Sequence, residues 1–106
     1  MAWLAVLVAG LLEVGWATSM KLSNGFSRPG PTVATFVLML ISFGLLSFAM
    51  RSLPLGTAYT VWTGIGAVGS VLVGILFMKE SSDPVRLICL GLIIAGIIGL
   101  RLTSPE

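Results

Sequence analysis

The stretch WLAVLVAGLLEVGWATSM, residues 3–20, sets the fold class of this chain. A helix of this length rises by about 1.5 Å per residue, which is enough to cross most of a hydrocarbon core about 30 Å thick. Glu13 lies near the middle of the stretch. Inside a membrane an ionisable residue is costly, and it generally marks a site that handles ions or protons. We therefore predict a transmembrane helix with a functional carboxyl group at its centre.

The residues around Glu13 indicate that it faces a neighbouring helix. Helical spacing places Gly10, Glu13 and Ala17 on one face, and Trp16 follows one turn after Glu13. The small residues at positions 10 and 17 let a second helix approach closely and keep Glu13 away from lipid. The alternative is a neutral glutamic acid that only holds helices together. We favour a binding site, because an ionisable group is a costly way to join such apolar helices.

Composition excludes several classes of protein. Of the 106 residues, 57% are hydrophobic and 9% are charged, against roughly 25% charged in soluble domains. The chain has no His and one Cys, which excludes histidine-based metal sites, Cys/His clusters and a Ser-His-Asp triad. The net charge of +2 comes from dispersed residues, so no basic patch points to nucleic acid. We predict one domain, residues 1–106, that lies in the cell membrane, needs no metal or cofactor and is not an enzyme.

Four apolar segments alternate with three polar breaks. We expect transmembrane helices over about residues 3–20, 33–50, 57–78 and 85–100, separated by breaks at 21–31, 51–56 and 79–84. Pro29, Gly30 and Pro31 place that part of the chain in the first break. Asp83 suits the N-cap of the last helix and Pro84 its first position. The short breaks predict an up-down bundle with both termini on one side.

Cations are distributed almost evenly between the two sides. The first and third breaks with their flanks carry 4 side-chain cations, and the side of the termini carries 2: Lys21, Arg28, Lys79 and Arg86 against Arg51 and Arg101. The positive-inside rule then favours cytoplasmic first and third breaks by two charges, or by one when the N-terminal amine is counted. A chain so evenly balanced is expected to insert in both orientations.

The third segment carries aromatic, hydroxyl and glycine residues. Tyr59, Trp62 and Gly66 fall on adjacent helical positions, as does Thr63. Residues 64–69, GIGAVG, match G-x-G-x-x-G. We reject a dinucleotide site, because no strand precedes the motif and it lies inside a membrane-length apolar run. We expect Gly64, Gly66 and Gly69 instead to allow close packing and bending of the helix.

A buried carboxylate near aromatic and hydroxyl groups suits an organic cation. The carboxylate attracts the charge, aromatic faces add cation–π contact, and hydroxyl groups orient the carboxylate. One group that holds either a proton or a cation is sufficient for antiport. Four helices are too few to enclose a gated path, and the sequence has no obvious internal repeat of the kind from which transporters build alternating access. Two copies inserted in opposite orientations supply the missing symmetry.

The whole chain resembles the small multidrug resistance transporters. The resemblance rests on residues 13–16 (EVGW), 21–28 (KLSNGFSR), 53–62 (LPLGTAYTVW) and the glycines at 64–69. It implies a four-helix protomer, an antiparallel dual-topology homodimer, and proton-coupled export in which substrate and protons share Glu13. Trp16, three residues after the glutamate, resembles the guanidinium exporter branch, whereas quaternary ammonium exporters usually have Gly there. The resemblance further implies that Trp16, Ser42 and Trp62 orient the carboxylate, and that Tyr59 lines the site. From its place on the Glu13 face, we expect Gly10 to line the site as well.

Two positions depart from the family pattern. Thr60 stands where the family usually has Ala, and it is expected to narrow or re-polarise the pocket. Cys89 and Gly96 stand where the family usually has two glycines seven residues apart, in the dimer seam of the fourth helix. Two alternatives stay open at this point. One is a promiscuous exporter of quaternary ammonium compounds, against which Trp16 speaks. The other is an accessory subunit of a heterodimeric membrane complex, against which the slight charge bias speaks.

Overall fold

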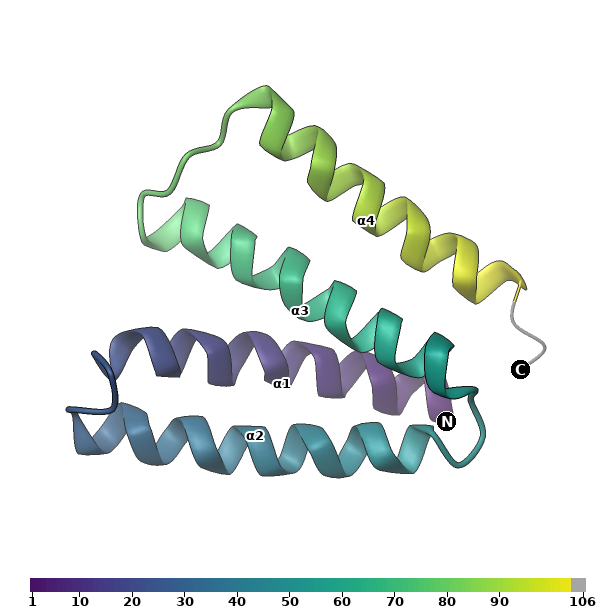
Figure 1. Cartoon of the computed structure of the whole chain (residues 1–106), viewed down its shortest axis with the longest axis horizontal. Coiled ribbons are helices and arrows are strands. Elements are labelled where there is room, and N and C mark those ends of the chain that lie inside the picture. The colour runs from purple at the N-terminus through teal and green to yellow at the C-terminus, as the bar shows by residue number, and fades with distance from the viewer. Residues whose placement is uncertain (104–106) are drawn as a thin grey trace.

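The computed structural model describes residues 1–103, which form four helices (Figure 1). They are α1 (Ala2–Leu22), α2 (Pro29–Ala49), α3 (Leu55–Phe77) and α4 (Pro84–Thr103). Each is long and apolar enough to cross a membrane. The prediction of an all-α protein with four membrane-spanning helices is confirmed, and the chain is a multi-pass membrane protein.

The helices alternate in direction, and the start of α1 and the end of α4 lie on one side, as predicted (Figure 1). Their packing, however, differs from a closed bundle. α1 packs against α2 and α3, whereas the backbone of α4 comes close to that of α3 alone. The molecule measures 43 × 35 × 16 Å, so its shortest dimension is little more than the diameter of one helix, about 10–12 Å. Lipid solvates an apolar face as well as protein does, so the outer face of α4 needs no cover within the protomer.

The first break is shorter than predicted, because α2 begins at Pro29. The expectation that Pro29, Gly30 and Pro31 lie outside the helix is wrong. All three occupy the first turn of α2, where backbone N–H groups have no partner within the helix. A proline there loses no hydrogen bond, and its fixed φ suits the helix. Arg28 precedes Pro29 in an extended conformation, which proline favours in the residue before it.

The last break ends as predicted. The N–H of Arg86 donates to the Asp83 carboxylate at 2.9 Å, and Pro84 is the first residue of α4. The Arg86 guanidinium also pairs with Glu80 at 2.7 Å, which ties the break to the first turn of α4. α4 continues to Thr103, three residues beyond the predicted end, and so is long enough to span.

The core lies among α1, α2 and α3 and is made of small side chains. The wholly buried apolar residues, each at most 1% exposed, are Val6, Ala9, Ala49, Ala58 and Val61. Alanine and valine let helix backbones approach closely, which is how helices associate in a membrane. This close approach fixes the register between α1 and its two neighbours, and it thereby places the residues around Glu13.

Candidate functional site

Glu13 points from α1 towards α3. A Cβ atom built at Gly66 of α3 would overlap the Glu13 carboxyl group and lie 2.8 Å from its Cγ. Only a glycine therefore leaves room for the carboxyl group at this point of α3. The Glu13 Oε1 atom is buried and has no hydrogen-bond partner among the described residues. The carboxyl group lies at a helix contact with one acceptor atom unused.

Close contacts between α1 and α3 flank the carboxyl group on both sides. A Cβ at Gly10 of α1 would lie 2.7 Å from two side-chain carbons of Ile65, and a Cβ at Gly69 of α3 would overlap Val14. The two helices are thus held at a distance that glycine alone permits. The prediction that a helix packs closely on the Gly10 face is confirmed, and the shelter of Glu13 from lipid stays a prediction.

Ser42 joins three helices beside this contact. Its side chain is fully buried in α2 and donates a hydrogen bond to the backbone oxygen of Ala9 in α1 at 2.7 Å. The same hydroxyl oxygen accepts a hydrogen bond from the indole N–H of Trp62 in α3 at 3.0 Å. Both hydrogen-bonding functions of the hydroxyl group are satisfied in an apolar interior, so this node holds the three helices in one register.

An aromatic row links the three helices beside the Ser42 hydrogen bonds. Trp16 meets Phe43 edge to face at 6.4 Å between ring centroids, and Phe43 meets Trp62 at 5.8 Å. Trp62 in turn contacts Tyr59 at 5.6 Å. Aromatic faces of this kind attract organic cations. Sequence reasoning missed Phe43, whose only signal was its place beside Ser42 in a segment rich in phenylalanine.

The structure brings Trp16, Ser42 and Trp62 together through this row and the Ser42 hydrogen bond. In the described part of the chain, no hydrogen bond joins any of the three to Glu13. Their role in orienting the carboxylate therefore stays a prediction. The indole Nε1 of Trp16 is buried without a partner, as is Glu13 Oε1. An unused donor and an unused acceptor thus occur one helical turn apart on α1.

Tyr59 and Thr60 lie nearer the start of α3 than Gly66, the residue opposite Glu13. They line a cleft of about 370 Å³ between α3 and α4, together with Thr63, Gly64 and Ile93. Tyr59 precedes Gly66, the neighbour of Glu13, by seven residues, which is roughly 10 Å along a helix. A single chain does not bring these two hydroxyl groups to the carboxyl group, and their role in the site stays a prediction.

The remaining predicted positions concern packing. Gly64 faces α4, where an added Cβ would lie 2.9 Å from Ile97, so all three glycines of α3 allow close contact as predicted. α3 is one continuous helix, and a bend at these glycines stays a prediction. Cys89 and Gly96 lie on exposed positions of α4, and no atom lies within 4 Å of a Cβ built at Gly96. Their role in a dimer seam stays a prediction too.

Comparison with known proteins shows a family and several similar chains. The family model described as Small Multidrug Resistance protein matches residues 1–93. A guanidinium exporter of Salmonella typhimurium strain LT2 is 57% identical over 104 residues, which cover 98% of this chain and 99% of that protein. The guanidinium exporters of Citrobacter freundii and of Escherichia coli strain K12 are 56% and 54% identical with the same coverage.

Proposed function

The chain belongs to the small multidrug resistance family, and from this premise we propose that it exports guanidinium and small guanidinyl cations in exchange for protons. The observation that carries the proposal is Glu13, the one acidic residue within the four described spans. It lies at the α1–α3 contact with an unused acceptor and with an aromatic row close by. The relatives named guanidinium exporters match almost the full length of the chain, which supports the choice of substrate.

Protons and substrate compete for Glu13 in this proposal. A carboxyl group binds a proton or pairs with a cation, and it does one at a time. A proton that enters from one side therefore displaces the cation towards that side. The site then opens to the other side with the carboxyl group protonated, and the proton is released there. The other described acidic residues, Glu80 and Asp83, lie in the break before α4. Glu13 is therefore the acidic group that this mechanism uses.

Guanidinium fits the site better than a quaternary ammonium ion does. Guanidinium is flat and offers N–H donors in a fork that pairs with a carboxylate through two hydrogen bonds. Trp16 one turn from Glu13 narrows the site and offers an indole ring for stacking. Its unused N–H is a donor that can hold the carboxylate in a fixed orientation. A quaternary ammonium ion has no donor, so it cannot satisfy a carboxylate held in this way.

A second copy in the opposite orientation completes the transporter. Tyr59 and Thr60 are exposed and lie apart from Glu13 within one chain, and in our proposal a second chain brings them to the carboxyl group. α4 buries one residue, Leu90, and leaves its outer face, with Cys89 and Gly96, free for a partner helix. The cation count of 4 against 2 permits insertion in both orientations. We therefore propose an antiparallel homodimer.

Flux measurements on the reconstituted protein test this function. Purified protein in liposomes is given guanidinium or tetramethylammonium on one side, and the resulting proton movement is recorded. We expect proton flux with guanidinium and little with tetramethylammonium, because a site that forms hydrogen bonds with its ligand discriminates steeply against an analogue without donors. Equal fluxes with the two cations would favour a promiscuous quaternary ammonium exporter. No flux with either cation would overturn the proposal of transport by this chain alone.

A further inference from the structure

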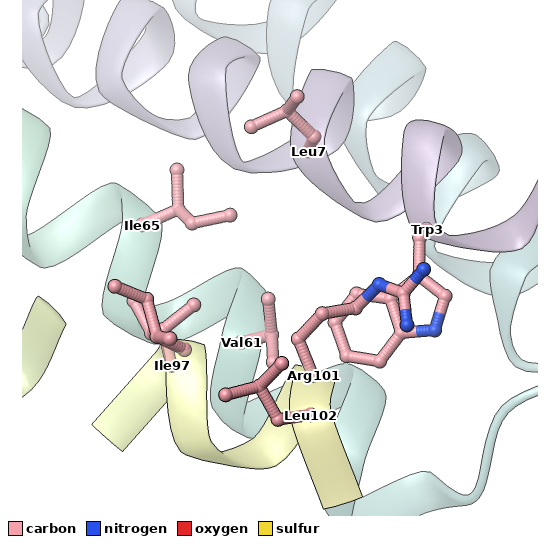
Figure 2. A pocket seen from close by; sticks show the side chains of 8 residues that line it. Trp3, Leu7, Val61, Ile65, Ile97, Arg101 and Leu102 are labelled. Atoms are coloured by element: carbon pink, nitrogen blue, oxygen red, sulfur yellow. The ribbon is translucent and has the colours of Figure 1, made fainter. Parts of the chain in front are cut away.

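A second cleft lies on the side of the termini, away from Glu13. It has a volume of about 320 Å³ and opens between α1, α3 and α4 (Figure 2). Its walls are aliphatic and include Leu7, Val61, Ile65 and Ile97, whereas its polar groups are confined to Trp3 and Arg101. Because the backbone of α4 comes close to that of α3 alone, the backbones of α1 and α4 do not close this gap.

One cation and one hydrogen-bond donor stand together at the cleft. The Arg101 guanidinium lies over the Trp3 ring, 5.1 Å from the ring centroid (Figure 2). None of the acidic residues that the structure describes pairs with Arg101, since the one ion pair among them joins Arg86 and Glu80. The indole N–H of Trp3 is buried and has no acceptor within the described part of the chain. A cation and a buried donor therefore lie together at this end of the cleft, and neither pairs with an acidic residue in the described part of the chain.

The places of the lining residues along α1 and α4 show how deep in the membrane the cleft lies. Trp3 is in the first turn of α1 and Arg101 in the last turn of α4, where the lipid head groups lie. Each aliphatic wall extends one turn deeper, since Leu7 follows Trp3 by four residues and Ile97 precedes Arg101 by four. One turn corresponds to about 5–6 Å. The cleft thus runs from the head-group level into the hydrocarbon, with its polar groups at the outer end.

We propose that this cleft binds an anionic phospholipid. Its phosphate pairs with the Arg101 guanidinium and accepts the Trp3 N–H once the two side chains part, while an acyl chain lies along the aliphatic walls. Basic pockets between transmembrane helices bind anionic head groups in the same manner. A choline or ethanolamine head group places a second cation beside Arg101, which disfavours zwitterionic lipids. The lipid fills the gap between α1 and α4 and thereby steadies the end of α4.

Native mass spectrometry of the purified protein tests the charge contact. The protein is offered phosphatidylglycerol and phosphatidylcholine with identical acyl chains in equal amounts. We expect the wild type to retain phosphatidylglycerol with about a fivefold preference, since one arginine at the membrane surface contributes about that factor. Arg101→Gln should remove the preference. Arg51→Gln is the matched control, because Arg51 is exposed, lies on the same side and does not line the cleft, and it should keep the preference.

Tryptophan fluorescence tests the site itself. Phosphatidylglycerol with brominated acyl chains should quench the wild type more strongly than brominated phosphatidylcholine does. Trp3→Phe keeps the aromatic packing and the other two tryptophans, and it should abolish that difference. The proposal is overturned by a wild type without preference for phosphatidylglycerol, by an equal loss in Arg101→Gln and Arg51→Gln, or by an undiminished difference in Trp3→Phe.

Discussion

Gly66→Ala perturbs the transporter through a single methyl group. The added Cβ would overlap the Glu13 carboxyl group and lie 2.8 Å from Glu13 Cγ, whereas carbon atoms pack at about 3.5–4.0 Å. The Glu13 side chain must therefore move by roughly 1 Å. Misplacing a reacting group by that distance costs on the order of 100-fold in enzymes. We expect guanidinium transport to fall by a similar factor.

Folding should suffer much less than transport. Overpacking costs about 1–3 kcal/mol, and replacing a helical glycine by alanine returns about 1 kcal/mol. The free energy of unfolding should thus fall by at most about 2 kcal/mol. Gly44→Ala is the matched control, because Gly44 lies within α2 and an added Cβ meets nothing within 4 Å. Guanidinium uptake into liposomes under a fixed pH gradient measures both variants. Uptake by Gly66→Ala at the wild-type rate would refute the placement of Glu13 against Gly66.

Three further predictions concern the node, the selectivity and the topology. Ser42→Ala leaves the buried Trp62 N–H without an acceptor, so it should destabilise the protein by about 1–3 kcal/mol. Thermal unfolding in detergent measures this change, and an unfolding temperature equal to that of the wild type would contradict the role of Ser42 in joining the helices. Trp16→Gly should lower guanidinium transport and admit bulkier cations, and liposome flux with the two cation classes measures both effects; an unchanged profile would remove Trp16 from the site. Adding two lysines on the side of the termini should drive the chain into one orientation and reduce activity, which C-terminal reporters on the two sides of the membrane and a flux assay detect; full activity in a single orientation would exclude the antiparallel pair.

The four spans were predictable because long apolar runs separated by proline, glycine and charge allow few other interpretations. The start of α2 was not, because a proline excludes the interior of a helix and favours its first turn, and the sequence alone does not say which applies at Pro29. The close approach of the α4 backbone to α3 alone was also beyond the sequence. In a membrane chain, faces that meet lipid and faces that meet protein are both apolar, so their pattern does not separate them.

The site was predictable in its residue types more than in its contacts. Glu13 stands out because a charge is rare in such a segment, and small neighbours predict a closely packed helix. That Gly66 is the residue opposite Glu13 depends on the register of two helices, and register is a tertiary property. The same holds for Ser42, which bonds Trp62 and the α1 backbone, and for Phe43, which links Trp16 to Trp62.

The most direct test of a site shared by protons and substrate is the release of protons when guanidinium binds. Guanidinium is added to purified protein in weakly buffered detergent solution, and a pH indicator reports released protons over a range of pH values. The wild type should release protons where Glu13 is protonated before binding, and release should fade as the pH rises and the proton is already lost. Glu13→Gln should release none at any pH. Binding by the wild type without proton release throughout the range, or equal release by Glu13→Gln, would contradict the account.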